Sequence, residues 1–117
     1  MASVAAAVER VKEGEAMLYT WAITSTNTEG LSIDAHEYGD RSVQFAGSFD
    51  GASVSLQGSN DGTNWATLTD PQGNALTKSA SALETVMEVP RYTKVTSSGG
   101  GGSQSITVSL FCRRTRR

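Results

Sequence analysis

The segment at residues 58–68, GSNDGTNWATL, carries the side chains best suited to chemistry. Asn60, Asp61 and Asn64 offer oxygen atoms of the kind that bind Ca²⁺, and Trp65 offers a flat ring on which a sugar could stack. A calcium loop needs several alternating carboxylates followed by a glutamate, whereas Asp61 is the only carboxylate in this segment. The sequence therefore disfavours a calcium site.

Trp65 leaves two interpretations open. If Leu68 faces a core, the alternation of side chains along a strand places Trp65 on the opposite, exposed face, but a single bulge would reverse that order. A tryptophan directly after a hairpin turn more often covers the edge of a core. The sequence favours this structural role, and the alternative is a glycan-binding site formed by Asn60, Asn64 and Trp65.

The sequence gives little evidence of a catalytic site. The one histidine, His36, lies in SIDAHEYGD beside Asp34, Glu37 and Asp40, a spacing that is common by chance in polar loops. Patterns of the types GxSxG, HExxH and CxxC do not occur, and the glycine run SSGGGGS lacks the Gly-Lys-Ser/Thr of a phosphate-binding loop. The single cysteine, Cys112, alternates with apolar residues and is expected to be inert. We predict neither an enzyme nor a cofactor or metal site.

The charge distribution is uneven. Four of the ten basic residues lie in the last five positions, as Arg113, Arg114, Arg116 and Arg117, so residues 1–112 hold six basic against twelve acidic residues. The body therefore has a formal charge of −6, which disfavours nucleic acid as a partner, while the tail attracts anionic surfaces. The tail is either a solvated terminus or an anchor for an acidic partner, and the sequence leaves both open.

The elements that must position these residues are short strands. The 117 residues suit one domain, no apolar run reaches the roughly 20 residues of a membrane span, and the first residues do not resemble a signal peptide. Alternation and turn residues such as Asp50–Gly51 predict strands at residues 17–24, 42–49, 53–58, 65–69, 83–89, 91–97 and 105–112. We expect an all-β fold, a small antiparallel β-sandwich or barrel of about seven strands.

The N-terminal residues 3–13 are the one stretch with a helical pattern. Val4, Val8 and Val11 would share a helix face, Ser3 could cap the helix and Gly14 could end it. We divide the chain into a helical or extended arm (1–14), a β-sandwich body (15–112) and a basic tail (113–117). The arm must pack on the body or on a neighbouring chain, because a helix of about 11 residues is marginal alone.

The alternation also predicts which side chains form the core. Phe111 falls on the opposite face of its strand from Ile106 and Leu110 and is a candidate contact residue beside the arginine tail. The predicted core comprises Val43, Phe45, Phe49, Val54, Leu56, Trp65, Leu68, Val86, Val95, Ile106, Val108 and Leu110.

Two resemblances follow from longer stretches. The order RSVQFAGSF, GASVSLQGSNDGTNW, LTDPQGNAL, VPRY and a final strand ending in arginines resembles the small head decoration (cement) proteins of tailed phages, over residues 41–114. The shorter stretch VSLQGSNDGTNWATL is similar to a hairpin of discoidin-type (factor 5/8 C-type) sandwiches, which are usually longer and often carry a cysteine pair absent here. That second resemblance implies the alternative function, a carbohydrate-binding module of an adhesin.

The decoration-protein resemblance implies a structural virion protein. It would be made in the host cytoplasm and bind the outside of an assembled capsid, stabilising contacts between major capsid subunits. Its partners would be the major capsid protein and copies of itself (a trimer favoured, a dimer possible), with no direct contact to nucleic acid or membrane. The residues expected to meet a partner are Val4, Val8, Val11, Phe111, Arg113, Arg114, Arg116 and Arg117.

Overall fold

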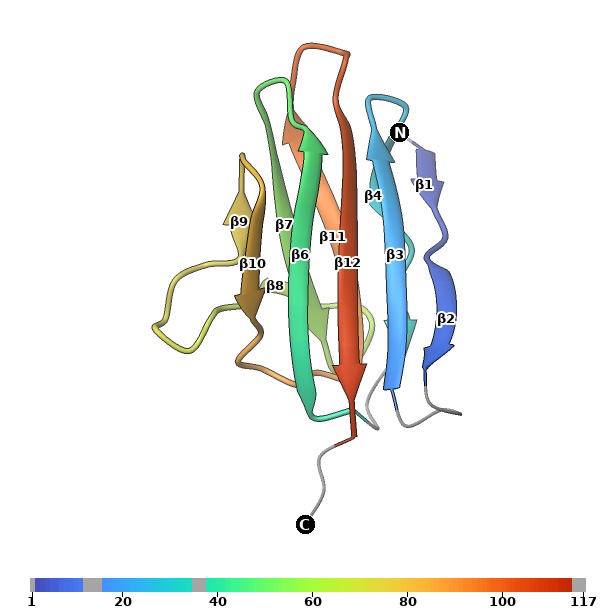
Figure 1. Ribbon diagram of the computed structural model, residues 1–117, viewed down its shortest axis with the longest axis vertical. Coiled ribbons are helices and arrows are strands. Elements are labelled where there is room, and N and C mark those ends of the chain that lie inside the picture. Colours follow the sequence, from blue (N-terminus) through green and yellow to red (C-terminus); the bar gives the residue numbers. More distant parts are fainter. Residues whose placement is uncertain (1, 12–15, 35–37, 115–117) are drawn as a thin grey trace.

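The computed structural model describes residues 2–11, 16–34 and 38–114, and all regular structure in these ranges is β. Two sheets pack face to face as a sandwich (Figure 1). The seven-stranded sheet contains β1 (Ala2–Val4), β4 (Asn27–Gly30), β5 (Ile33–Asp34), β7 (Ala52–Ser59), β8 (Ala66–Thr67), β9 (Thr77–Lys78) and β11 (Tyr92–Gly99). The five-stranded sheet has the order β10 (Ala82–Thr85), β6 (Asp40–Ser48), β12 (Ser105–Arg113), β3 (Ala16–Thr24) and β2 (Ala7–Val11).

The expected all-β sandwich is confirmed, and each of the seven predicted strands overlaps an observed one. Alternating apolar and polar residues predicted the long strands, because each of these strands buries the side chains of one face. The additional strands β1, β2, β4, β5 and β9 are two to five residues long, which leaves too little alternation to predict them. One pair, β1 with β4, is parallel, so the sandwich is not antiparallel throughout.

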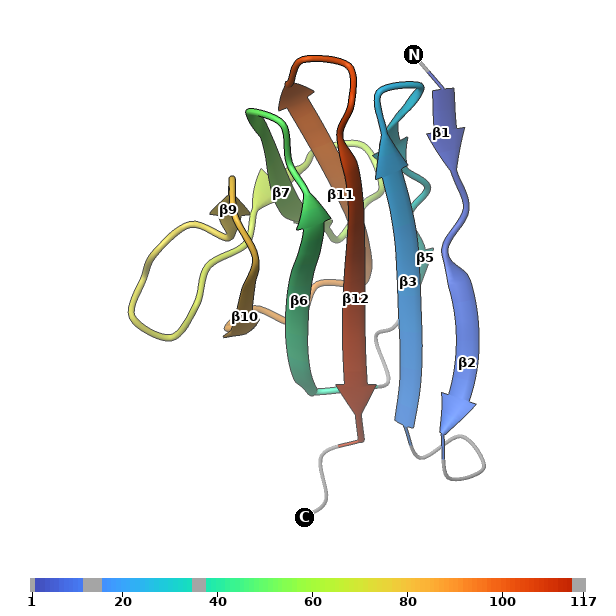
Figure 2. The ribbon, with the colours of Figure 1, turned by 45° about the horizontal axis from the view of Figure 1, so that its top comes forward.

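Of the two conformations expected for the N-terminal arm, the described residues adopt the extended one, and the helical pattern of residues 3–13 does not produce a helix there. The described part of this arm forms two strands, one in each sheet: β1 pairs with β4 (Figure 1), and β2 pairs with β3 (Figure 2). Valine favours strands, and the unpaired edges of β3 and β4 offer backbone hydrogen bonds that a short isolated helix cannot match. Since successive side chains of a strand alternate, Val8 and Val11 point to opposite faces of the five-stranded sheet rather than sharing one face.

Three connections between the sheets, from β3 to β4, from β6 to β7 and from β11 to β12, lie at one end of the sandwich, whereas the connection from β10 to β11 lies at the other (Figures 1 and 2). The predicted turn at Asp50–Gly51 is present, with positive φ angles of 47° and 82°. It joins β6 to β7 in the other sheet, and the glycine run SSGGGGS also crosses between sheets, from β11 to β12. Asp50 fastens these two connections together, because its backbone oxygen and Oδ2 accept hydrogen bonds from the N–H groups of Gly101 (2.9 Å) and Ser103 (3.0 Å).

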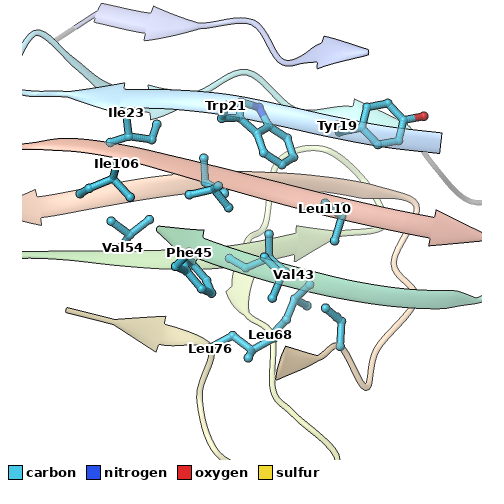
Figure 3. Close-up of a cluster of buried hydrophobic side chains, with 14 of the residues drawn as sticks. Tyr19, Trp21, Ile23, Val43, Phe45, Val54, Leu68, Leu76, Ile106 and Leu110 are labelled. Carbon is cyan, nitrogen blue, oxygen red and sulfur yellow. The ribbon is translucent and has the colours of Figure 1, made fainter. Parts of the chain in front are cut away.

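The core lies between the sheets, and eleven of the twelve predicted core residues are buried; the exception is Trp65. Its centre contains Trp21, which the sequence did not mark as core (Figure 3). The indole Nε1 donates to the Leu31 carbonyl at 2.9 Å, and the ring lies so close to Gly30 that a Cβ there would stand 2.4 Å from it. The other buried hydrophobic residues that were not predicted are Ala16, Tyr19, Ile23, Tyr38, Ala52, Leu76 and Cys112.

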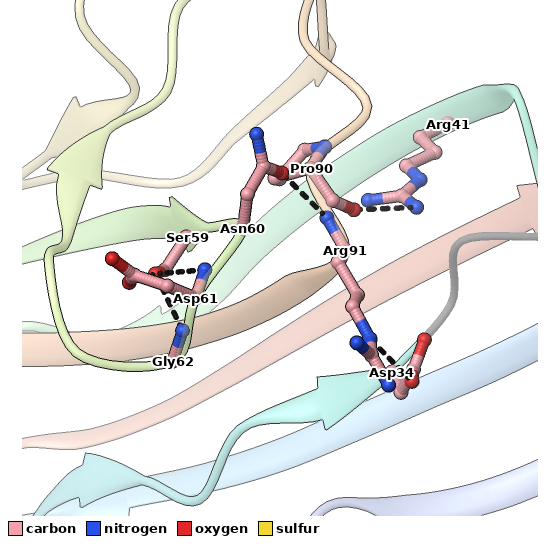
Figure 4. Close-up of polar contacts among 8 residues, drawn as sticks. All are labelled: Asp34, Arg41, Ser59, Asn60, Asp61, Gly62, Pro90 and Arg91. Carbon is pink, nitrogen blue, oxygen red and sulfur yellow. Dashed lines mark hydrogen bonds and ion pairs between the residues drawn. The ribbon is translucent and has the colours of Figure 1, made fainter.

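Arg41 is a charged residue inside this apolar layer, with 4% of its surface exposed. It lies on β6, and its guanidinium reaches across to the other sheet. Nη1 donates to Thr93 Oγ1 at 3.1 Å, Nη2 donates to the Pro90 carbonyl at 3.3 Å (Figure 4), and Nε donates to the Tyr38 carbonyl at 2.9 Å. Burial lowers the pKa of Arg41, and the hydrogen bonds make the side chain a polar link between the two sheets.

Candidate functional site

The last residues of β12 bring an aromatic ring and a cation to one place. Phe111 lies on the outer face of the five-stranded sheet, in register with Ser42 on β6 and Leu18 on β3, and is half-buried. Arg113 lies two residues further on the same face, opposite Asp40. Together they border a hollow of about 280 Å³, lined by Gly39, Asp40, Arg41, Ser42, Thr85, Val86, Phe111 and Arg113.

The two described tail arginines are held differently. Arg113 Nη2 lies 3.7 Å from Asp40 Oδ2, and these side chains are 64% and 50% exposed. An ion pair of this length in water contributes about 0–1 kcal/mol, so another carboxylate could replace Asp40 at little cost. The guanidinium of Arg114 lies 5.5 Å from the ring centroid of Tyr38, a buried residue, so the start of the tail contacts the body.

The structure separates the other predicted contact residues from this hollow. Val4 is half-buried and packs against the core, Val11 is half-buried, and Val8 is 56% exposed on the edge strand β2. None of the three lines the hollow. Arg116, Arg117 and His36 lie outside the described residues.

The loop after β7 is held together by its own side chains. Asp61 Oδ1 accepts hydrogen bonds from Ser59 Oγ, Thr63 N and Asn64 N, each at 2.9 Å, and Oδ2 accepts from Asn64 Nδ2 at 2.8 Å. These bonds, first those from the backbone of Asn64 and Thr63, hold the pKa of Asp61 far below its usual range. Ser59 Oγ in turn accepts from Gly62 N (Figure 4). The carboxylate thus organises the turn.

Trp65 lies on the outer face of the seven-stranded sheet, and its assignment to the core is wrong. It precedes β8, where Thr67 pairs with Gln57 and Gln57 with Lys94 on that outer face. Alternation places Trp65 on the same side as Thr67, with Leu68 facing inward. The Lys94 Nζ stands 4.5 Å from the ring centroid of Trp65, a cation–π contact that covers part of the ring.

Asn60 and Asn64 line a second hollow, of about 370 Å³, together with Gly58, Ser59, Leu68, Glu88, Val89 and Pro90. Trp65 is not among the lining residues, so the structure does not unite the three residues of the predicted glycan site. Asn60 Oδ1 accepts the backbone N–H of Arg91 at 3.1 Å, which ties the loop to the segment that follows Pro90 (Figure 4).

Potential metal ligands are dispersed over the described part of the chain. In the described ranges no three His, Cys, Asp or Glu side chains are grouped to hold a metal ion. Cys112 is buried, and burial raises the pKa of its thiol to about 11. The same ranges contain no helix of the length and apolar character needed to span a membrane.

Sequence reasoning found Phe111 and Arg113 but not the residues that complete their hollow. Asp40 and Ser42 reach it through the register of β6 beside β12, and Thr85 and Val86 come from β10 and its end. The pairing of β6 with β12 and with β10 joins segments far apart in the chain. Alternation within one strand does not specify which other strand will lie beside it.

These observations define an all-β sandwich whose described residues line the two hollows at the end of β12 and beside the loop after β7. No protein-family model matches the chain, and neither a curated protein nor a solved structure matches it.

Proposed function

We propose that this chain is a structural protein that binds the outside of an assembled phage capsid and stabilises contacts between major capsid subunits. The proposal rests on the resemblance over residues 41–114 and on one structural observation that supports it. Phe111 and Arg113 border a single hollow at the end of β12, from which the basic tail continues.

The chemistry of this end suits an acidic protein surface. The half-buried Phe111 ring offers apolar contact, while Arg113 offers a guanidinium whose present partner, Asp40, is half-exposed and weakly held. A carboxylate of the capsid that displaces Asp40 would form a charge-assisted hydrogen bond with Arg113 in the hollow that Phe111 also lines. Because the body of the chain is acidic, it would repel an acidic capsid surface, and the basic tail is the region that such a surface would attract.

Stabilisation of the capsid would follow from mass action. A protein that binds the assembled shell and not the free subunits adds its binding free energy to the stability of the shell. Many copies on one symmetric lattice, or an oligomer of the chain, would add avidity. Modest contacts at each site are then sufficient for a large combined effect.

The experiment mixes the purified chain with expanded phage capsids and measures bound copies per capsid by sedimentation and electron microscopy. We expect saturable, lattice-wide binding that weakens as salt rises. A chain lacking residues 113–117 and the variant Phe111→Ser should both show reduced occupancy. Absence of saturable binding to the expanded capsid would refute the proposal.

A matched control keeps the assay specific. Leu83→Ser changes an apolar residue of the same sheet that is 67% exposed on β10 and does not line the hollow. This variant should bind as the unchanged chain does. Equal losses for Phe111→Ser and Leu83→Ser would indicate a general effect of surface polarity and not a site at the end of β12.

A further inference from the structure

The hollow beside the loop after β7 has a different chemistry from the one at the end of β12. It is lined by two amides, one hydroxyl, one carboxylate and the apolar side chains of Leu68, Val89 and Pro90. Leu68 and Pro90 are buried, and Val89 is 45% exposed. The volume of about 370 Å³ lies at the lower end of the range for small-molecule sites.

The two amides are held in place by bonds that leave one atom of each available. Asn60 uses Oδ1 to accept from Arg91 N, and within the described residues no group accepts from its Nδ2. Asn64 uses Nδ2 to donate to Asp61 Oδ2, and no described group donates to its Oδ1. Each of these two lining residues thus keeps one polar atom for a ligand, a donor on Asn60 and an acceptor on Asn64, on a side chain already held by one hydrogen bond, which lowers the entropy cost of binding.

The charge of the lining selects against anions. Glu88 is the only ionisable side chain among the lining residues, and it accepts the backbone N–H of Thr69 at 2.8 Å and the Thr69 hydroxyl. Burial would raise the pKa of Glu88, but the hydrogen bonds from Thr69 outweigh it and lower the pKa, so the carboxylate is ionised at neutral pH. An anionic ligand would be repelled, whereas hydroxyl groups could donate to it.

The same lining offers a surface for C–H groups. Leu68, Val89 and Pro90 are aliphatic, and the amides and the carboxylate accompany them in one hollow. A ligand that matches must have an apolar face, several hydroxyls that both donate and accept, and no negative charge. Neutral sugar rings have this combination.

We propose that this hollow binds a neutral saccharide, with Asn60 Nδ2 donating to a ring hydroxyl or ring oxygen, and Asn64 Oδ1 and Glu88 accepting from hydroxyls. The aliphatic side chains contact the C–H face of the sugar. Trp65 takes no part, because it lies on the outer face under Lys94. The site is independent of the end of β12 and does not depend on capsid binding.

Nuclear magnetic resonance titration of the ¹⁵N-labelled chain tests the proposal. The probes are glucose, galactose, mannose and N-acetylglucosamine, with glucuronate as the anionic comparison. We expect saturable shifts of the amide signals of residues 58–64 and 88–91 by at least one neutral sugar, with a Kd of millimolar order, as is usual for a small open site. Glucuronate should bind more weakly than glucose.

Four variants test whether the sugar occupies this hollow. Asn60→Asp keeps the oxygen that accepts from Arg91 N but removes the free donor, and Val89→Ser removes an aliphatic contact; each should weaken binding by roughly 3- to 10-fold. Trp65→Ala and Leu83→Ser should leave the affinity unchanged. Unaltered far-ultraviolet circular dichroism and melting temperature verify that each variant is folded.

The proposal is overturned if none of the neutral sugars produces saturable shifts in these residues. It is also overturned if Asn60→Asp and Val89→Ser bind as the unchanged chain does, if glucuronate is preferred, or if Trp65→Ala abolishes binding. The last result would move the site to the outer face of the seven-stranded sheet.

Discussion

Replacing Arg41 tests whether a buried cation holds the two sheets together. Arg41→Met keeps much of the length of the side chain but removes the donors to the carbonyls of Tyr38 and Pro90 and to Thr93 Oγ1. Each buried acceptor left without a donor costs about 1–3 kcal/mol. Removal of a buried charge recovers part of that free energy, because the desolvation of the guanidinium is no longer needed.

The expected balance is a loss of about 3 kcal/mol in the free energy of unfolding for Arg41→Met. Arg41→Lys should lose less free energy of unfolding than Arg41→Met, because the ammonium keeps a charged donor. It should still lose some, because an ammonium cannot reproduce the planar fork that reaches both Pro90 and Thr93. In a double-mutant cycle with Thr93→Val, the coupling free energy should be about 1 kcal/mol, because Arg41 Nη1 bonds Thr93 directly.

Urea unfolding followed by circular dichroism measures these differences, provided that the m value is unchanged. Arg91→Met is the matched control, because Arg91 is exposed and its Nε lies 3.4 Å from Asp34 in a solvent-facing ion pair; this variant should change stability by less than about 1 kcal/mol. An Arg41→Met chain within about 0.5 kcal/mol of the unchanged chain would refute the role of Arg41 as a link, since its hydrogen bonds would then merely offset its own desolvation.

Further predictions concern backbone, thiol and carboxylate groups. Gly47→Ala should lower the free energy of unfolding in urea by about 3 kcal/mol or more, because φ is 121° and a Cβ would lie 2.3 Å from the Ser105 carbonyl oxygen. Gly51→Ala is the matched control and should lower it by only about 1 kcal/mol, because φ is 82° but no atom lies within 4 Å of the added Cβ. Burial raises the pKa of the Cys112 thiol to about 11 from about 9, so the free energy of unfolding should fall as pH rises between these two values. The buried thiol should also react with a thiol reagent only after the chain unfolds, and rapid reaction of the native chain would contradict its burial. Hydrogen bonds lower the pKa of Asp61 from 3.8, so its carboxylate should remain ionised in the folded loop at pH 3.8 and stabilise the loop until the pH falls through the lower pKa. A carbon-detected titration of this carboxyl group measures its pKa, and an ordinary value would disprove the hydrogen-bond network.

The long strands were predictable because each buries one face. The segment at Ser105–Arg113 alternates so regularly that both the buried Ile106 and Leu110 and the outward Phe111 follow from the pattern. The turn at Asp50–Gly51 was likewise fixed by local chemistry, since two adjacent positive φ angles favour this pair of residues. Local rules were sufficient in both places.

Pairing between distant segments was not predictable from local rules. The arm looked helical because alanine and glutamate favour helices, and only the free edges of β3 and β4 make it extended. Arg41 reads as a surface residue until Thr93 and the Pro90 carbonyl are placed opposite it. The two hollows depend on the same long-range register, and so their lining was only partly predicted.

Strand β12 has a mechanical consequence. It lies between β6 and β3 and is antiparallel to both along all of its nine residues, Ser105–Arg113. A pull on the chain after Arg113 acts along the strand, so the hydrogen bonds of two ladders bear the load together in shear and must rupture together instead of opening one after another. If a partner held the chain at this end, tension would pass directly into the centre of the five-stranded sheet, the part of the sandwich best arranged to resist it.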